Sequence, residues 1–589
     1  MNENQITLKY IFKLILKNKP VFIYGQIITL LAILVSVPIP LMLPIMVDEI
    51  LLNKPSYFVH GIDSLIGVTN PFIYIGIVTL VVLFLRLTYF TLGVVNTKIF
   101  TKISKYVTFM IRKRLIKHLK IATMNEYEVL GSGAITANLI TDVNTLDAFI
   151  ITSVSRFVSS VLTLLAVGMI MIAIDPILGI MILIIQPIIM LLSKSMSKKV
   201  GKLKKQENRA IEKFQDKVGE TLELYGQIKA SNKENYFFSN AIVGAKNIQE
   251  ASNEYGYKSV AYEKFSFTIF LIAFEIFRAS GLLLVVYSGL SIGMMFAMFG
   301  YIWFIMTPVQ DILSMQYSYA SAMSAINRIN EILKLKIEKS GDKILDSDEV
   351  CISLKDLDFS YSKDKQILKK ISLDIKAGCK IALIGASGSG KTTLAQVVAG
   401  FYEKCSGELS YNNILTEDLS KNSLREKIFL VLQMPVLFNS TLRFNISMGD
   451  NKISDDEINK ALEISQLSEM IENMPEKLDT AVGRNGVRLS GGQRQRLSIA
   501  RMIIANPSVV IFDESTSALD VQTETKLYAN LSQILKEKTV ITIAHRLSTV
   551  KNADYIYVLD AGKIVQRGTH KELEAQEGHY IDFVRNQLI

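Results

Sequence analysis

Six long apolar stretches in the first half of the chain constrain its fold more than any other feature of the sequence. They lie at about 21–46, 71–96, 154–174, 176–196, 265–290 and 292–315 of the 589 residues. A helix of roughly 20 apolar residues crosses a hydrocarbon core about 30 Å thick. The first stretch is too long for a secretory signal and lacks a small-residue cleavage site, so we expect it to be retained. The first half is therefore predicted to be an all-α membrane domain with six spans.

Charge separates the two halves of the chain and orients the spans. Residues 1–340 hold 34 Lys and Arg against 22 Asp and Glu, whereas residues 341–589 hold 31 against 33. Basic residues near the ends of spans are retained on the cytoplasmic side. They gather before the first span and in the connections after the second and fourth, so both termini are predicted to be cytoplasmic. We interpret the basic excess as the signature of a multi-pass protein of the cell membrane, expected in the bacterial inner membrane, and not as a nucleic-acid groove.

The composition divides the chain into four predicted parts. Residues 1–20 are expected to be a cytoplasmic N-terminus, in which the apolar face of residues 5–18 predicts an interfacial helix. Residues 21–333 form the transmembrane domain, and 334–349 form a polar linker. In 350–589, short β-branched runs alternate with helical stretches, which predicts an α/β domain with a largely parallel sheet. The three Cys and five His lack metal-binding spacing, so a zinc site or a disulfide framework is not expected.

A glycine-rich loop in the α/β domain carries the first chemical signal. It follows the predicted strand 380–384 and precedes a helix that starts at Thr393, and it reads Gly385, Ala386, Ser387, Gly388, Ser389, Gly390, Lys391, Thr392. Glycines in this setting let backbone N–H groups surround phosphates at a helix N-terminus. We expect Lys391 to reach the β and γ phosphates of a nucleotide, and the hydroxyl of Thr392 to take a Mg²⁺ position.

Two carboxylates end another buried strand of the same domain. The apolar run 509–512 is followed directly by Asp513 and Glu514. Acidic residues at the carboxyl end of a parallel strand lie beside the phosphate loop of such a sheet. We assign Asp513 to Mg²⁺ through a water molecule, and Glu514 to the general base that activates the attacking water.

The segment LSGGQRQRLSIARM, at 489–502, extends this pattern to a family. With this segment, the chain resembles the ATP-binding cassette (ABC) exporters in which six spans precede one cassette. The resemblance implies a type 1 exporter membrane domain followed by a P-loop NTPase domain. The resemblance implies ATP and Mg²⁺ as cofactors and two cassettes that face each other head to tail. Ser490, Gly491, Gly492 and Gln493 would then act in trans, on the nucleotide held by the other cassette. The implied partner is a second copy of the chain, although this chain could also be the intact half of a heterodimer.

The resemblance assigns further residues one by one. Tyr361 matches the aromatic residue that stacks on adenine, Gln433 the glutamine that touches Mg²⁺ and faces the membrane domain, and His545 the switch histidine that contacts the γ-phosphate. Residues 517–520 resemble the loop that crosses to the other cassette, and Arg484 stands where the family often has Glu. Short coupling helices are implied near 131–142 and 219–233.

These features together predict ATP-driven export by alternating access. A drug-like or lipidic amphiphile is the expected substrate, and a peptide exporter without a protease domain is the alternative. Six spans argue against a soluble cassette protein, and the intact catalytic residues argue against an ATP-gated channel. Three charges fall within spans, where they are costly and often functional, namely Arg86, Glu275 and Arg278. The last two are spaced to pair on one helix face, and the sequence identifies neither their role nor the substrate.

Overall fold

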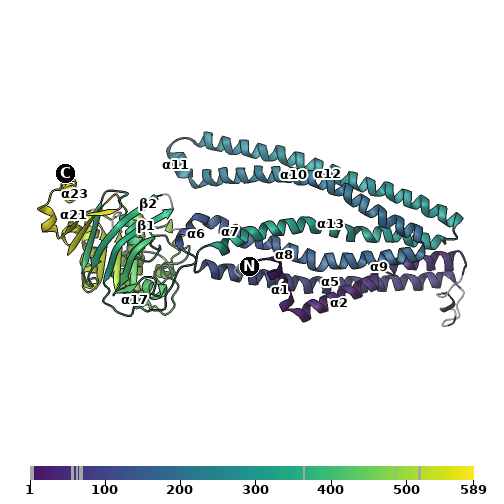
Figure 1. Ribbon diagram of the computed structural model, residues 1–589, viewed down its shortest axis with the longest axis horizontal. Coiled ribbons are helices and arrows are strands. Elements are labelled where there is room, and N and C mark those ends of the chain that lie inside the picture. The colour runs from purple at the N-terminus through teal and green to yellow at the C-terminus, as the bar shows by residue number, and fades with distance from the viewer. Residues whose placement is uncertain are drawn as a thin grey trace. The chain divides into compact units, whose positions relative to one another are not determined.

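The computed structural model describes residues 5–54, 59–61, 64, 70–362, 365–483, 486–514, 519–544 and 546–588. It divides into two compact units (Figure 1). The membrane unit comprises Met1–Lys117 with Gly133–Lys334, and the cassette unit comprises His118–Ser132 with Leu335–Ile589. The short segment His118–Ser132, which falls within the predicted transmembrane domain 21–333, belongs with the α/β part of the chain.

The membrane unit begins with an amphipathic helix and a proline-rich first span. Helix α1 (Leu8–Lys17) starts at Thr7, whose side chain accepts a hydrogen bond from the backbone of Tyr10. Its apolar face is buried by the protein, and the backbone of Ile6 exchanges two hydrogen bonds with the side chain of Asn330, at 2.8 and 2.9 Å. An interfacial position for α1 stays a prediction. Helix α2 (Lys19–Ser36) is followed by turns over Ile39–Leu41, α3 (Met42–Pro44) and a π-helical turn over Ile45–Leu51.

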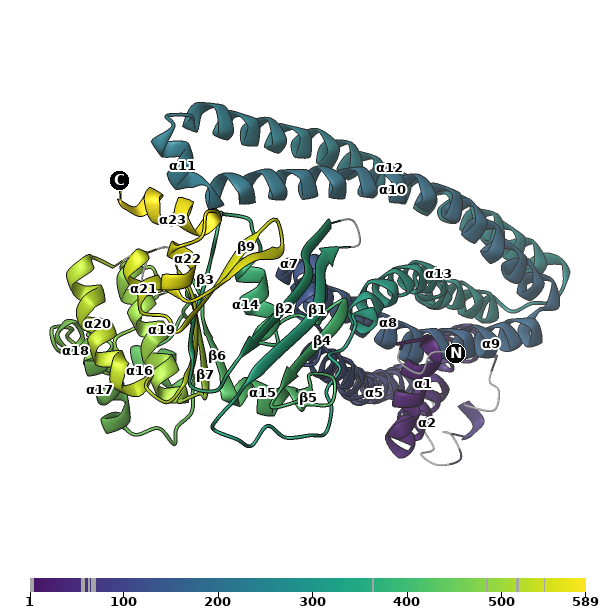
Figure 2. The same ribbon diagram turned by 60° about the vertical axis from the view of Figure 1, so that its left-hand side comes forward.

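Helices of six to 54 residues make up the rest of the described part of the membrane unit. They are α5 (Pro71–Leu119), α7 (Ser132–Ala137), α8 (Val143–Ile151), α9 (Val158–Ile174), α10 (Pro176–Glu223), α11 (Tyr225–Ala230), α12 (Glu234–Tyr287) and α13 (Ile292–Lys334), with π-helical turns over Asn138–Asp142 and Thr152–Phe157. At 1.5 Å per residue, the 54 residues of α12 extend about 80 Å, well beyond a hydrocarbon core of about 30 Å. Helices α10 and α12 run side by side, and α11 joins them at one end (Figures 1 and 2).

Five stretches within the described residues are long and apolar enough to cross a membrane: Lys19–Leu51, Pro71–Leu119, Ser132–Ile174, Glu234–Tyr287 and Ile292–Ile312. The remaining expected span, 176–196, opens α10, and the side chains at several of its positions lie outside the description. A helical membrane domain is thus confirmed, and the count of six spans stays a prediction. Asp175 caps α10 by accepting a hydrogen bond from Leu178 at 2.9 Å, with Pro176 at the first helical position.

The charges predicted within spans lie on the surface of the membrane unit. Glu275 and Arg278 form the expected ion pair on α12, and about half of each side chain is exposed. Arg86, on α5, is also exposed. Charges at membrane depth face protein or a water-filled cavity, so these positions are not typical of a lipid-covered helix surface.

The cassette unit contains two sheets. The six-stranded sheet has the order β10-β9-β3-β8-β7-β6, and the four-stranded sheet has the order β2-β1-β4-β5. The larger sheet is parallel except for β10, which pairs with β9 in the antiparallel sense (Figure 2). Its strands are β3 (Lys380–Gly385), β6 (Ile428–Val431), β7 (Val509–Asp513), β8 (Thr539–Ile543), β9 (Tyr555–Asp560) and β10 (Lys563–Gly568). The largely parallel sheet is therefore as predicted.

The smaller sheet is antiparallel throughout and was not predicted. It consists of β1 (Ile352–Ser362), β2 (Lys365–Ile375), β4 (Ser406–Tyr411) and β5 (Ile414–Leu415). Buried and exposed positions alternate along β2, because one face of the strand packs on the core and the other faces solvent. Inward side chains of both sheets, together with α14 (Lys391–Val398), form one core cluster.

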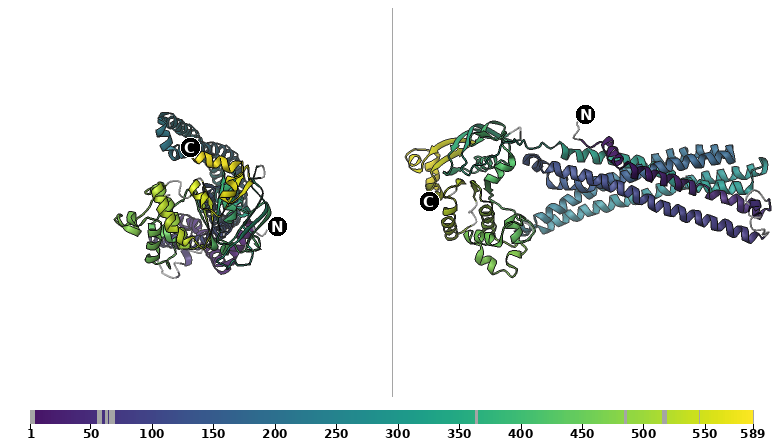
Figure 3. Two further views of the ribbon diagram at one scale, coloured as in Figure 1. Left: turned by 90° about the vertical axis from the view of Figure 1, so that its left-hand side faces the viewer. Right: turned by 90° about the horizontal axis from the view of Figure 1, so that it is seen from below.

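Helices complete the cassette unit around the two sheets (Figures 2 and 3). They are α6 (Met124–Leu130), α15 (Lys421–Lys427), α16 (Leu442–Ser447), α17 (Asp455–Ile464), α18 (Ser468–Glu472), α19 (Gly491–Ala505), α20 (Val521–Ile534), α21 (Leu547–Lys551), α22 (His570–Glu574) and α23 (His579–Leu588). The predicted linker is packed on this unit, since Leu345 is buried and Lys343 forms an ion pair with Asp418 at 2.9 Å.

Candidate functional site

The phosphate loop lies at the carboxyl end of β3, in the middle of the parallel sheet. Strand β3 is flanked by β9 and β8, and β7 lies beyond β8. Gly388 and Gly390 have φ angles of 80° and 103°, in the left-handed region that favours glycine. A Cβ atom built at Gly388 would meet no atom within 4 Å, so the backbone here borders open space. A glycine-rich turn of this kind before the N-terminus of a helix is the arrangement of an anion site, because free backbone N–H groups gather there.

Lys391 is the buried cation of this loop. Its ammonium donates to the carbonyl oxygens of Gly385 and Ala386, at 2.9 and 3.0 Å. Burial lowers the pKa of Lys391, and the nearby carboxylates of Glu514 and Asp513 oppose that shift. A buried ammonium held by two carbonyls is suited to meet the charge of a triphosphate, because a phosphate anion compensates the desolvation of the cation.

The predicted metal-site residues are brought together beside the loop. The hydroxyl of Thr392 donates to the carboxylate of Asp513 at 3.2 Å, and Asp513 is buried at the end of β7. The amide nitrogen of Gln433 donates to Glu514 at 2.5 Å. Glu514 has a φ of 45°, a strained conformation that recurs at functional sites. Two hydrogen bonds thus join Thr392 and Gln433 to the adjacent carboxylates Asp513 and Glu514, which lie far from both in the sequence.

The signature segment forms the capped N-terminus of α19. Ser490 accepts a hydrogen bond from the backbone of Gln493 at 3.2 Å, and the side chain of Gln493 accepts one from the backbone of Ser490 at 2.8 Å. This reciprocal capping box orders the exposed Ser490. Gly491 and Gly492 form the first helical positions, so their N–H groups point out of the helix end.

The structure describes only some of the remaining predicted residues. The hydroxyl of Tyr361 lies 3.1 Å from both Thr393 Oγ1 and Gln396 Oε1, which puts its ring beside the helix that follows the phosphate loop. His545, Arg484 and residues 517 and 518 of the expected crossing loop 517–520 lie outside the described residues. Arg546, which follows His545 in the sequence, forms an ion pair with the buried Glu524 of α20.

The residues present fit a nucleotide with Mg²⁺. The buried hydroxyl of Ser389 in the phosphate loop is one of three buried side-chain groups in the described part of the chain that lack a hydrogen-bond partner. A polar ligand in the loop would satisfy such a group. Thr392 and Asp513 supply oxygen atoms, as does the amide oxygen of Gln433, and oxygen ligands with few protein donors are typical of Mg²⁺ bound to phosphates.

Two further residues tie the signature helix to Gln433 and its loop. The side chain of Gln495 donates to the carbonyl of Gln433 at 3.3 Å. Arg501 donates from Nε and Nη2 to the backbone and side-chain oxygens of Asn445, at 2.5 and 2.9 Å, and from Nη1 to the carbonyl of Val436 at 3.2 Å. The sequence analysis missed both residues. A charged residue in an otherwise apolar stretch of helix was the available signal for Arg501.

Helix α6, which precedes the first expected coupling segment 131–142, belongs to the cassette unit. Residues 131–142 were expected to dock on the cassette, but it is α6, before Gly131, that contacts the cassette residues. Asn125 donates to the carbonyl of Tyr361 at 3.1 Å, and Glu128 accepts from the hydroxyl of Tyr402 at 3.0 Å. Gly131, with a φ of 77°, ends α6, and the following residues return to the membrane unit.

Apolar spans and a phosphate loop with paired carboxylates define a membrane-bound P-loop ATPase, and known proteins identify its family. Residues 22–309 match the transmembrane region of ABC transporters, and residues 368–517 match the ABC transporter ATP-binding domain. The chain is 33% identical over 501 residues to an ATP-dependent lipid A-core flippase of Pasteurella multocida, covering 81% of this chain and 83% of that protein. It is 29% identical to a putative multidrug export ATP-binding/permease protein of Bacillus subtilis, covering 80% and 82%.

A solved structure agrees in fold. A bacterial Atm1-family ABC exporter with ATP bound superimposes with a TM-score of 0.83 at 21% identity, covering 97% of this chain and 98% of that one. The chain belongs to the ABC transporter family, as an exporter half-transporter that fuses the membrane region to one cassette. It is accordingly an ATP-hydrolysing membrane translocase, as the sequence predicted.

Proposed function

We propose that two copies of this chain form an exporter that works by alternating access in the bacterial inner membrane, with both termini in the cytoplasm. The observation that carries the proposal is that one cassette presents two different halves of a nucleotide site. Its phosphate loop holds Lys391 and Thr392 beside Asp513, whereas its signature helix offers an exposed Ser490 that is already ordered by its own cap. Two such cassettes, arranged head to tail, would complete two equivalent sites.

Hydrolysis in this proposal depends on the carboxylate of Glu514. Bound Mg²⁺ would be held by Thr392, Gln433 and, through water, Asp513, and it would neutralise the charge of the phosphates. Glu514 orients the attacking water and accepts its proton, and the amide of Gln433 fixes the carboxylate. Lys391 neutralises phosphate charge, and His545 is assigned to the γ-phosphate from the family pattern.

An exposed apolar patch next to Gln433 supports coupling to the membrane helices. Met434, Val436, Phe438 and Phe444 form this coupling patch, and Met434 is 82% exposed. Large exposed apolar patches mark interaction sites. Helix α11 of the second copy, which carries the exposed Tyr225, is the proposed occupant and falls within the expected coupling segment 219–233.

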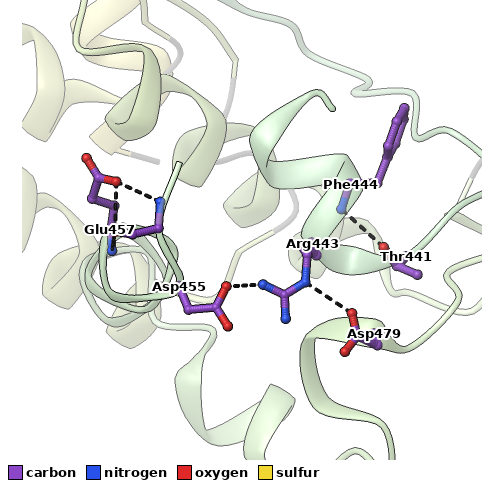
Figure 4. Close-up of polar contacts among 7 residues, drawn as sticks. Thr441, Arg443, Phe444, Asp455, Glu457 and Asp479 are labelled. Carbon is purple, nitrogen blue, oxygen red and sulfur yellow. Dashed lines mark hydrogen bonds and ion pairs between the residues drawn. The ribbon is translucent and has the colours of Figure 1, made fainter. Parts of the chain in front are cut away.

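Ion pairs hold the helix that presents Phe444. Arg443, on α16, bonds to Asp455 at the start of α17 and to Asp479, the latter at 3.1 Å (Figure 4). The backbone of Phe444 donates to the capping side chain of Thr441 at 3.1 Å. These contacts fix α16 against its neighbours, so the patch is preformed.

A mixed dimer tests the shared nucleotide site. Lys391→Ala removes the phosphate-loop function of one chain, and Ser490→Ala removes the signature hydroxyl of the other. If sites form in trans, the mixed dimer keeps one intact site and hydrolyses ATP at up to half of the parental rate, above either variant alone. Co-expressed chains with two different affinity tags allow isolation of the mixed dimer, and equal inactivity of all three species would contradict the proposal.

Substrate class and direction need a second experiment. A lipidic or drug-like amphiphile is proposed because the relatives are a lipid A-core flippase and a putative multidrug exporter. Drugs, lipids and peptides are screened for stimulation of ATPase activity in lipid bilayers, and active compounds are then tested for uptake into inverted vesicles. Glu514→Gln is the control, since it should retain ATP binding and lose uptake and turnover. Stimulation by peptides alone would instead favour a peptide exporter.

A further inference from the structure

An aromatic cluster supports the ring of Tyr361. The ring of Phe359 lies 4.9 Å from it at 86°, and the ring of Tyr402 lies 5.2 Å from it at 90°. Such edge-to-face pairs contribute about 0.5–1.5 kcal/mol beyond the area that they bury. Phe359 lies on the same strand as Tyr361, whereas Tyr402 follows α14 and reaches the cluster from another part of the fold.

Helix α6 holds two members of this cluster by polar contacts. The hydroxyl of Tyr402 donates to the carboxylate of Glu128, with both oxygens at 3.0 and 3.1 Å. The side chain of Asn125 donates to the carbonyl of Tyr361 at 3.1 Å. Burial and the carboxylate of Glu128 raise the pKa of Tyr402, so its hydroxyl remains a donor at physiological pH. Every one of these contacts lies within the cassette unit.

The segment that carries α6 is itself anchored to residues 336–338 of the cassette unit. The backbone of Thr123 donates to the carbonyl of Lys336 at 2.9 Å, and the backbone of Glu338 donates to the carbonyl of Ile121 at 2.8 Å. These two bonds fix the start of α6 in a strand-like pairing with residues 336–338. A displacement of α6 would therefore strain the bonds to Tyr402 and Tyr361 together.

We propose that Glu128 and Tyr402 are positioning residues for adenine: Glu128 holds Tyr402, and Tyr402 holds the ring of Tyr361 on which the base stacks. Base recognition by the cassette then depends on a helix that the chain inserts between two of its membrane spans. The inference rests on the proposed role of Tyr361. It concerns the base alone, because the contacts of the phosphates lie on the loop 385–392.

The test compares ATP with inorganic tripolyphosphate, which has no base, using full-length protein in lipid nanodiscs. Glu128→Gln and Tyr402→Phe should each raise KM for ATP about threefold to tenfold, the loss expected for one hydrogen bond of ordinary net strength. The inhibition constant of tripolyphosphate and kcat should stay within twofold of the parent. The KM for ATP of the double variant should not exceed that of the weaker-binding single variant, because both substitutions act through one contact. Glu126→Gln is the matched control, since Glu126 lies on the same helix and faces Lys336 instead, at 4.0 Å.

The outcomes separate this inference from the proposed function. If Tyr361→Ala raises KM for ATP while Glu128→Gln and Tyr402→Phe retain the parental value, the positioning role is wrong and the adenine site stands. If Tyr361→Ala leaves KM unchanged, the proposed adenine site itself is wrong. Weaker tripolyphosphate inhibition in parallel with weaker ATP binding would indicate general damage and overturn the inference. Glu128 is exposed on α6, so its variant keeps the test informative even if Tyr402→Phe folds poorly.

Discussion

Replacing Arg501 should destabilise the cassette more than any surface charge, because this guanidinium joins the signature helix to the loop after Gln433. Its three hydrogen bonds reach Val436 and two oxygens of Asn445, a fully buried residue. The side chain of Asn445 in turn donates to the carbonyls of Phe438 and Thr441, at 3.0 Å each. Arg501→Met removes three donors and leaves three carbonyl-type acceptors without them.

The magnitude follows from opposing contributions. A hydrogen bond to a charged group stabilises by about 1.5–3 kcal/mol, and desolvation of a buried ion offsets several kcal/mol of the total. Burial lowers the pKa of Arg501, which shows that this desolvation acts on its charged form. We expect Arg501→Met to lower the free energy of unfolding of the cassette by about 2–4 kcal/mol.

Thermal unfolding of the full-length protein in nanodiscs measures the effect. At about 2–4 °C per kcal/mol for a unit of this size, the cassette transition should fall by about 4–16 °C. Arg501→Lys should show a smaller decrease, because an ammonium keeps the charge and a hydrogen-bond donor, although it cannot reproduce the three-pronged geometry. Arg567→Met, at an exposed position of β10, is the control. A decrease of under about 1 °C for Arg501→Met would refute the reasoning.

Four further predictions concern the loop, the signature and the core. Lys391→Ala should weaken ATP binding at least about tenfold, measured by equilibrium binding. Burial lowers the pKa of Lys391, and bound phosphates favour its charged form, so ATP binding should take up protons at alkaline pH. The affinity for ATP should therefore fall as pH rises through the lowered pKa of Lys391. An affinity that is unchanged up to pH 10 would contradict this prediction. Ser490→Ala should lose about 1 kcal/mol of capping, seen as faster hydrogen exchange in the first turn of α19, whereas equal exchange would show that the cap is dispensable. Tyr411→Phe should cost about 1–2 kcal/mol in thermal unfolding, since its buried hydroxyl donates to the carbonyl of Val398 at 2.5 Å, and no loss would mean that this bond contributes nothing net.

The buried strands were predictable because burial on both faces leaves an uninterrupted apolar run. All five residues of β7 are buried, and the run 509–512 was enough to find the strand and its two carboxylates. The same reasoning failed for β2, whose sequence KQILKKISLDI mixes polar and charged residues with apolar ones. A strand that exposes one face resembles a polar connection unless its partner is known. The antiparallel sheet could therefore be recognised only from the structure, where the partners of each strand are known.

The site was predictable where a short motif includes its own geometry. The phosphate loop combines its strand, its glycines and its helix in one segment, so Lys391 and Thr392 were identified directly. The contact of α6 with Tyr402 has no such local signature, because residues 124 to 130 are more than 200 positions from their partners. The expected docking segment was consequently displaced toward 131–142. Pairings of this kind depend on how distant segments pack and cannot be read from either segment alone.

Gln433 explains how a change at the nucleotide reaches the signature helix. Its amide nitrogen bonds to Glu514, its carbonyl accepts from Gln495 of α19, and the coupling patch begins at the next residue, Met434. Any event that draws Glu514 toward the nucleotide pulls on a side chain whose backbone is bonded to the signature helix. Arg501 fixes a second point of the same segment to α19, at Val436. The loop between these two points is bonded to α19 at both of them, so in the proposed mechanism closure of the nucleotide site would move the coupling patch together with α19.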